Sequence, residues 1–234
     1  MKLILKSLFF LSIFPALLST YILFIYFSVE IDFEREKNKR ESWVLIDRIS
    51  PFAKWAIVLS EDWAFYDHKG LDYNQLGIVL AESFSSGTLT RGASTISQQV
   101  VKNLYFSNER SLIRKFKEVI LTYKLEKTLT KDQILEIYLN IIEFGEDLYG
   151  VRDASYFYFD IPPSKLRIRE SAFLAMLLPS PKKYSVSFRN KELTPFANEV
   201  VGNILIKMRQ ARVISEDQRV FALDERFWWE SLEE

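Results

Sequence analysis

The chain has 234 residues, a length that fits one domain or one domain with an added anchor. Its 31 basic and 31 acidic side chains balance, which argues against a general nucleic-acid-binding surface. The absence of cysteine excludes disulfide scaffolds, Cys-based zinc sites and thiol nucleophiles. The single histidine, His68, excludes a multi-histidine metal site and argues against a Ser-His-Asp triad.

The first predicted element is a membrane anchor over residues 8–29, which carry no charged side chain. A helix that rises about 1.5 Å per residue crosses a hydrocarbon core of roughly 30 Å over this length. The alternative is a cleaved signal peptide. Its apolar region spans about 7–15 residues and ends in a small-residue cleavage site, whereas an acidic segment from Glu30 to Glu34 follows here.

The charges around the anchor predict its orientation. Lys2 and Lys6 precede it, which favours a cytoplasmic N-terminus. Basic residues also follow it, at positions 35, 37, 39 and 40, and these oppose that orientation. The predicted organisation is a cytoplasmic N-terminus (1–7), a transmembrane anchor (8–29), a juxtamembrane segment (30–50) and a folded domain outside the cytoplasm (51–234).

The remainder of the chain predicts a mainly α-helical domain. Asp72, Ser94 and Thr130 are residue types that cap helix N-termini, and glycine and proline punctuate the predicted helices. The sequence contains no series of alternating apolar residues typical of strands, which argues against an α/β sheet. The predicted helices cover 72–86, 94–104, 109–129, 131–142, 163–178 and 191–212.

The segment from Glu61 to Gly70 is the first with candidate chemistry. Acidic and aromatic residues alternate along it. A carboxylate beside apolar rings is desolvated, which raises its pKa and suits it to proton transfer near neutral pH. The alternative is a polar loop held in place by aromatic anchors.

In the segment from Arg91 to Asn103, small residues precede a predicted helix, whose N-terminus Ser94 or Thr95 can cap. Thr95, Gln99 and Lys102 then share one helix face. A hydroxyl, an amide and an ammonium in a row can bind sugar hydroxyls and phosphate oxygens. A solvent-facing polar stripe is the alternative.

The helix predicted over 109–129 carries Arg110, Arg114 and Glu118 four residues apart on one face. Two such arginines repel each other unless an anion, such as a pyrophosphate, lies between them; a solvated face also explains the pattern. Leu121 and Leu125 continue this face, which predicts that Glu118 lies at the edge of the interior or of a cleft. The opposite, apolar stripe is expected in the core and consists of Ile113, Phe116, Ile120 and Tyr123.

Five segments occur in order between roughly residues 55 and 185. Together they resemble the peptidoglycan glycosyltransferases, or murein polymerases, in their monofunctional form. The chain departs from that family's pattern at Arg152–Ser155, at Asp160 (often Gly) and at Ser171 (usually Ala). The five matching segments are Glu61–Gly70, Gly92–Asn103, Arg114–Glu118 with Leu125-Glu126, Ile134–Asn140 with Gly145 and Gly150, and Glu170–Ala175 with Leu178–Pro181.

The resemblance implies a mainly α-helical, lysozyme-like fold with two lobes around a cleft, tethered by an N-terminal transmembrane helix. It also implies polymerisation of lipid II, a lipid-pyrophosphoryl disaccharide-pentapeptide, into β-linked glycan with inversion at the anomeric centre. The catalytic domain would be periplasmic on a single-pass bacterial inner-membrane protein. The implied partners are lipid II, the nascent glycan strand, the membrane and other cell-wall synthesis or division proteins, with no nucleic acid.

Residue roles carried over from the resemblance make Glu61 the general base and Glu118 the second essential acid. Glu118 would position substrate or a divalent cation such as Mg²⁺; no cofactor is required. Three cations, Lys102, Arg110 and Arg114, would bind the donor pyrophosphate. The residues expected to shape the substrate site are Asp62, His68, Thr95 and Gln99, with His68 bracing the loop through hydrogen bonds.

Two other functions remain open at this stage. A glycan-cleaving lytic transglycosylase or lysozyme would also use one catalytic glutamate, but would not need the three cations. An inactive cell-wall scaffold would not need Glu61 and Glu118. The end of the chain at Glu234 predicts no transpeptidase domain. The aromatic residues 227–229 could be core, membrane-interface or partner contacts.

Overall fold

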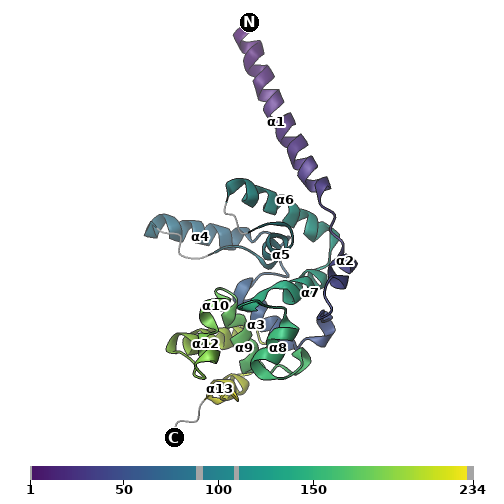
Figure 1. Cartoon of the computed structure of the whole chain (residues 1–234). Coiled ribbons are helices and arrows are strands. Elements are labelled where there is room, and N and C mark those ends of the chain that lie inside the picture. The colour runs from purple at the N-terminus through teal and green to yellow at the C-terminus, as the bar shows by residue number, and fades with distance from the viewer. Residues whose placement is uncertain (1, 88–91, 108–110, 231–234) are drawn as a thin grey trace.

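The computed structural model describes residues 2–87, 92–107 and 111–230, with side chains described from residue 15 onward. The described part is mainly α-helical, as the sequence predicted. In Figure 1, α1 projects from the body, α4, α5 and α6 lie nearest to it, and α8 to α13 form the opposite end. The only strands in the described residues, β1 and β2, form a short antiparallel pair.

The helices and strands follow each other with short connections. Two 3₁₀ turns, Ile46–Arg48 and Pro163–Lys165, precede α3 and α9. The elements are α1 (Lys2–Ser28), α2 (Phe33–Asn38), α3 (Pro51–Glu61), α4 (Tyr73–Ser86), α5 (Ile96–Tyr105), α6 (Leu112–Thr128), α7 (Lys131–Ile141), β1 (Glu143–Gly145), β2 (Leu148–Tyr149), α8 (Val151–Phe159), α9 (Ile168–Leu177), α10 (Pro181–Tyr184), α11 (Val186–Arg189), α12 (Pro195–Gln210) and α13 (Glu216–Asp224).

The predicted helices correspond to α4, α5, α6, α7, α9 and α12. Asp72 and Thr130 cap α4 and α7 as expected, but Thr95 rather than Ser94 caps α5. The helix predicted over 163–178 begins later, because a 3₁₀ turn occupies its first residues. Helices α3 and α8 were not predicted, because their buried faces become recognisable only once they pack.

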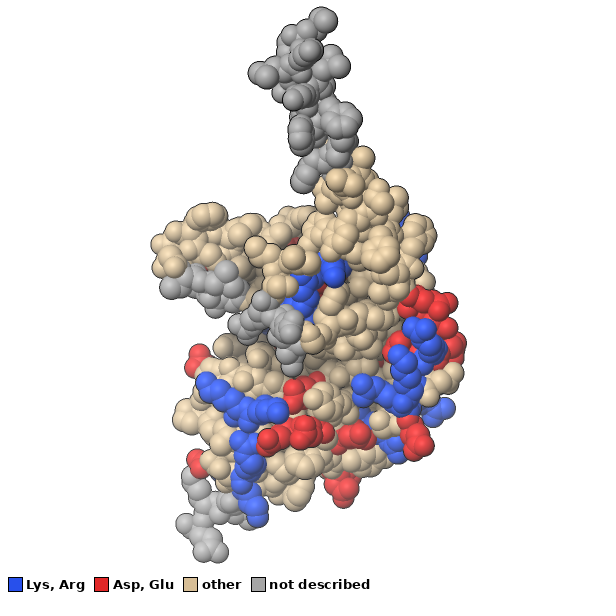
Figure 2. All heavy atoms as spheres, turned by 45° about the horizontal axis from the view of Figure 1, so that its top comes forward, with Lys and Arg blue, Asp and Glu red and all other residues tan. Residues whose placement is uncertain are grey.

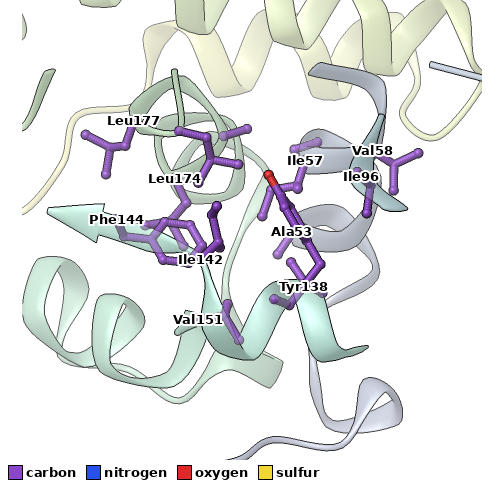
Figure 3. Packing of buried hydrophobic residues seen from close by; sticks show 14 of the residues in the cluster. Ala53, Ile57, Val58, Ile96, Tyr138, Ile142, Phe144, Val151, Leu174 and Leu177 are labelled. Carbon is purple, nitrogen blue, oxygen red and sulfur yellow. The ribbon is translucent and has the colours of Figure 1, made fainter. Parts of the chain in front are cut away.

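The core forms where α3, α9 and α12 pack against one another. Figure 3 shows Ala53 and Ile57 of α3, Leu174 of α9 and Tyr138 of α7 converging on it, with Phe144 of β1 beside them. All of these side chains are buried. The C-terminal residue of α3 is Glu61, so this packing fixes the position of that carboxylate.

The outward face of α6 corrects one prediction. The stripe expected in the core is largely exposed: Ile113 is 65% exposed and Tyr123 is 55% exposed, while Ile120 is buried. The reason is that α6 turns its other face, which carries Glu118, Leu121 and Leu125, into the protein. Its apolar stripe instead lies beside α1, where Val119, Ile120 and Tyr123 line a hollow of ≈ 400 Å³ with residues of α1.

The segment between α2 and α3, expected from the sequence to lie beside a membrane, is attached to α7 by polar residues of the fourth matched segment. The Glu136 carboxylate accepts hydrogen bonds from Trp43 Nε1 and the Ile46 backbone N–H, both at 2.8 Å. The Asn140 amide bonds both backbone groups of Val44, at 2.7 and 2.9 Å. Glu136 and Asn140 are buried, so they hold this segment in place rather than facing a substrate.

Among the helices whose side chains the structure describes, none is long and apolar enough to cross a membrane. The predicted anchor over residues 8–29 stays a prediction.

The C-terminal aromatic residues belong mainly to the core. Phe227 and Trp229 are buried and stack with ring centroids 4.9 Å apart, next to Phe173 of α9. Trp228 is exposed, although its indole N–H donates to the Tyr158 carbonyl at 3.1 Å. Packing against α8 and α9 therefore explains two of these three aromatic residues, Phe227 and Trp229.

The departures from the family pattern fit the structure locally. Asp160 adopts φ +55° at the end of α8, a left-handed conformation that glycine adopts freely and that aspartate tolerates. Ser171 is buried, and its hydroxyl donates to the Arg167 carbonyl at 2.7 Å. Arg152 is exposed at the start of α8.

Candidate active site

Glu61 lies at the C-terminal end of α3, beside α5. Its Oε2 accepts a hydrogen bond from the Gln99 side-chain amide at 2.8 Å. Burial raises the pKa of Glu61 above its ordinary value; the Gln99 hydrogen bond and the charges of Lys207 and Lys102 act in the opposite direction. A carboxylate with raised proton affinity is suited to accept a proton near neutral pH.

Asp62 and His68 brace the loop that follows Glu61. One Asp62 oxygen lies 2.9 Å from His68 Nε2, and the other accepts the Ile96 backbone N–H at the start of α5. The Gly70 backbone N–H donates to His68 Nδ1 at 3.1 Å, so the ring proton sits on Nε2 and is donated to Asp62. All these hydrogen bonds join groups of the protein to one another, so Asp62 and His68 stabilise the loop and the start of α5.

Thr95 and Gln99 connect α5 to the same loop and to Glu61. The buried Thr95 hydroxyl donates to the Gly70 carbonyl at 2.6 Å and accepts from the Gln98 backbone N–H, which completes the N-cap of α5. Gln99, one turn later, holds Glu61 with its amide nitrogen. The structure thus joins five expected site residues in one hydrogen-bond network: Glu61, Asp62, His68, Thr95 and Gln99.

Glu118 belongs to a second network, centred on α6. Its side chain is only 2% exposed. Arg114 donates to one carboxylate oxygen at 3.0 Å, and the Lys115 ammonium pairs with the other. Lys115 also donates to the Ser94 hydroxyl at 3.3 Å. Both networks therefore reach the segment around the start of α5, and α5 packs directly on α6.

The surroundings of Glu118 do not fit a divalent cation. Both of its oxygens are paired with cationic side chains, which would repel a metal ion. Within residues 2–87, 92–107 and 111–230, no group of three or more potential metal ligands occurs. The arrangement instead suits a carboxylate that orients two cations.

The remaining expected cations differ in their surroundings. Lys102 is exposed near the end of α5, close enough to Glu61 to lower its pKa. Arg114 is partly buried, and its Nε makes no hydrogen bond within the described part of the chain. Arg110 lies outside the described residues.

Comparison with known proteins identifies the family. The transglycosylase family model matches residues 29–209, which is most of the chain. The chain belongs to the transglycosylase family. This confirms the resemblance inferred from the five segments.

Proteins named biosynthetic peptidoglycan transglycosylase are similar to this transglycosylase over most of its length. The Acinetobacter baylyi protein is 42% identical over 158 residues, covering 67% of this chain and 70% of its own. The Nitrosospira multiformis protein is 38% identical over 183 residues, covering 76% and 78%. The Janthinobacterium protein is 36% identical over 206 residues, covering 79% and 89%.

Three residues near the transglycosylase site were not among those expected from the sequence. Lys207 of α12 donates to the Leu59 carbonyl at 3.2 Å, and its charge lowers the pKa of Glu61. Tyr138 of α7 donates to Gln99 at 3.1 Å. Lys115 could have been found from its i, i+3 spacing to Glu118, whereas Lys207 carries no local signal that connects it to Glu61.

Proposed function

We propose that this transglycosylase polymerises lipid II into β-linked glycan, with Glu61 as the general base. The observation that carries the proposal is a partly buried carboxylate of raised pKa, held by one oxygen through Gln99. Glu61 would remove the proton of the acceptor sugar hydroxyl as that oxygen attacks the anomeric carbon of the donor, with inversion. Proton transfer of this kind typically contributes about 10²–10⁴ in rate.

The leaving group of this reaction is a lipid pyrophosphate, which needs positive charge around it. Lys102 and Arg114 supply that charge, together with Arg110. Lys102 is exposed, so its ammonium is available to phosphate oxygens, and Arg114 adds a positive charge on a side chain that is 19% exposed. Glu118 acts by fixing Arg114 and Lys115 from the buried side. A glycan-cleaving enzyme would have no use for this cationic group.

The helices α5 and α6, which carry Lys102 and Arg114, lie at the end of the protein from which α1 projects (Figure 1), and this supports a substrate with a lipid tail. Figure 2 shows a largely uncharged surface around α1 and the projecting α4, while charged side chains cover the opposite half. The exposed apolar residues there include Phe84 on α4 and Leu112 on α6, which are 87% and 90% exposed. Apolar patches of this kind occur at membrane contacts.

The proposed location follows from this surface and from the uncharged run at residues 8–29. The chain would be a single-pass protein of the bacterial inner membrane, with a cytoplasmic N-terminus and a periplasmic catalytic domain. Lipid II and the growing strand would then reach the site from the membrane surface. Other cell-wall synthesis or division proteins are the proposed class of protein partner.

The test is polymerisation of lipid II by the detergent-solubilised full chain and its Glu61→Gln variant. We expect the variant to keep its thermal transition and to lose at least about 10²-fold in rate, because the amide cannot accept the proton. Asp67→Asn is the matched control, since Asp67 is an exposed carboxylate of the same loop. A folded Glu61→Gln enzyme with substantial activity would contradict the proposal, as would cleavage of purified sacculi without polymerisation of lipid II.

A further inference from the structure

Tyr138 contacts the Glu61 site indirectly, through Gln99. Its side chain is completely buried, and its hydroxyl donates to Gln99 Oε1 at 3.1 Å. The other end of the same amide donates from Nε2 to Glu61 Oε2 at 2.8 Å. Figure 3 shows Tyr138 rising from α7 between residues of α3 and the core, with its hydroxyl at the far end.

The direction of the Gln99 amide matters because its two ends have opposite chemistry. The NH₂ end donates to the Glu61 carboxylate, whereas the carbonyl end would repel it. Rotation of the amide by 180° would exchange the two ends. The Glu61 carboxylate, which can only accept, selects the orientation with NH₂ toward it, and the Tyr138 hydroxyl bonds the carbonyl end, so the amide is held at both ends.

Tyr138 keeps its proton under all conditions in which the enzyme would be assayed. Burial raises its pKa well above 10, and the nearby carboxylates of Glu61 and Asp62 raise it further. The phenol therefore stays neutral and keeps the hydrogen that it donates to Gln99.

We propose that Tyr138 is a positioning residue for the general base, which acts by holding the carbonyl end of the Gln99 amide so that its NH₂ group stays within reach of Glu61. The NH₂ group donates to Glu61 Oε2, which leaves Oε1 to accept the proton of the acceptor hydroxyl. The inference rests on the proposed role of Glu61 as the base.

The decisive measurement is the pH dependence of kcat/KM for lipid II polymerisation by the full chain. In Tyr138→Phe the carbonyl end of the Gln99 amide loses its partner, the hydrogen bond from the NH₂ end to the carboxylate weakens, and the pKa of Glu61 rises. The acidic limb of the profile should then move upward by about one pH unit. Above the limb, where Glu61 is ionised in both enzymes, the rates should agree within about twofold.

The other groups that face Glu61 are unchanged in this variant. They are Lys207 from α12, Lys102 from α5 and the adjacent Asp62. Their charges act equally in both enzymes, so a displaced limb reports on the amide. A purely structural role of Tyr138 would lower the rate at every pH and leave the limb in place, which would overturn the inference.

Tyr158→Phe is the matched control. Tyr158 is equally buried, and its hydroxyl donates to the Phe144 carbonyl at 2.9 Å, with no connection to Gln99. The same hydroxyl is lost from the core, and the acidic limb should stay where it is in the unmodified enzyme. A limb displaced equally in both variants would overturn the specific role of Tyr138.

A second comparison uses Gln99→Leu, which leaves Tyr138 in place and by itself should move the acidic limb upward, because the amide that holds Glu61 is absent. On a Gln99→Leu background the amide is absent, so Tyr138→Phe should add no further displacement of the limb. An additional displacement there would show that Tyr138 acts by another route. Failure of the proposed function is recognised separately, since Glu61→Gln would then remain active, whereas failure of this inference alone leaves Glu61→Gln inactive.

Discussion

Gly70 is the residue at which the loop after Glu61 meets α6. Its backbone has φ +97°, and a Cβ built there would lie 2.9 Å from Thr122 Cγ2 and 3.2 Å from Glu126 Cγ. Its N–H and carbonyl are also used, by His68 and Thr95. Glycine is thus required here for conformation and for close approach, which gives the last position of the first matched segment a physical explanation.

We expect Gly70→Ala to destabilise the protein by about 1–3 kcal/mol, because it combines backbone strain with a clash against a buried helix. Thermal unfolding of the full chain measures this. Gly77→Ala is the control: Gly77 lies within α4, and a Cβ there meets nothing within 4 Å. That change should be neutral or stabilising by about 1 kcal/mol. Equal melting temperatures for the two variants would contradict the explanation.

Site residues could be predicted from the sequence where neighbouring residues on the same helix or loop formed a recognisable pattern. The burial of Glu118 followed from Leu121 and Leu125 on its own helix face. The contacts of Tyr138 with Gln99 and of Lys207 near Glu61 could not be predicted, because they arise when α7 and α12 pack beside α3 and α5. Tertiary packing, rather than spacing, decides which distant side chains meet.

Among the elements, α6 makes different contacts with its two faces. Its inner face carries Glu118, and its outer face contacts α1. Lys124 joins the two helices: its ammonium donates to the Tyr26 carbonyl at 2.6 Å and to the Val29 carbonyl at 2.5 Å, and lies 5.0 Å from the centre of the Tyr26 ring. The last carbonyls of a helix have no partner within it, so a lysine from α6 completes the end of α1.

The outward apolar face of α6 also explains why its predicted core stripe was wrong. Helical periodicity identifies an apolar face but not the medium that covers it. Here part of the cover is α1, and the outer stripe includes the exposed Ile113. A sequence pattern alone assigns such a stripe to the protein core.

Lys124→Met should loosen the junction between α1 and α6 while leaving the catalytic domain folded. The substitution keeps an apolar stem but removes charged hydrogen bonds, each contributing about 1.5–3 kcal/mol. Amide hydrogen exchange in residues 26–31 should therefore accelerate at least about tenfold. Lys127→Met is the control, because Lys127 is exposed on the same helix and its ammonium lies over the Tyr123 ring, 5.5 Å from the centroid. Unchanged exchange in the Lys124 variant would mean that apolar packing alone holds the junction.

At the scale of the whole molecule, charge and apolar surface are separated. The end that carries α1, α4 and α6 exposes apolar side chains, and the opposite end carries most of the charge seen in Figure 2. The segment between α2 and α3 is fixed to α7 through Glu136 and Asn140, so the body is held close to the end of α1. In the proposed membrane location, this geometry would bring the Glu61 site to the membrane surface without a flexible spacer.

The apolar face should assist catalysis only when the substrate is in a bilayer. We expect the double variant Phe84→Ser/Leu112→Ser to lower the polymerisation rate about tenfold or more with lipid II in vesicles, since each exposed side chain gains about 1.5–3 kcal/mol on burial in lipid. With a short-chain, detergent-soluble lipid II analogue the same variant should match the unmodified enzyme. Phe221→Ser is the control, because Phe221 is 71% exposed on α13 at the opposite end of the protein. Equal losses with both substrates would mean that these two residues act in the substrate site. No loss with either substrate would contradict the proposed membrane contact.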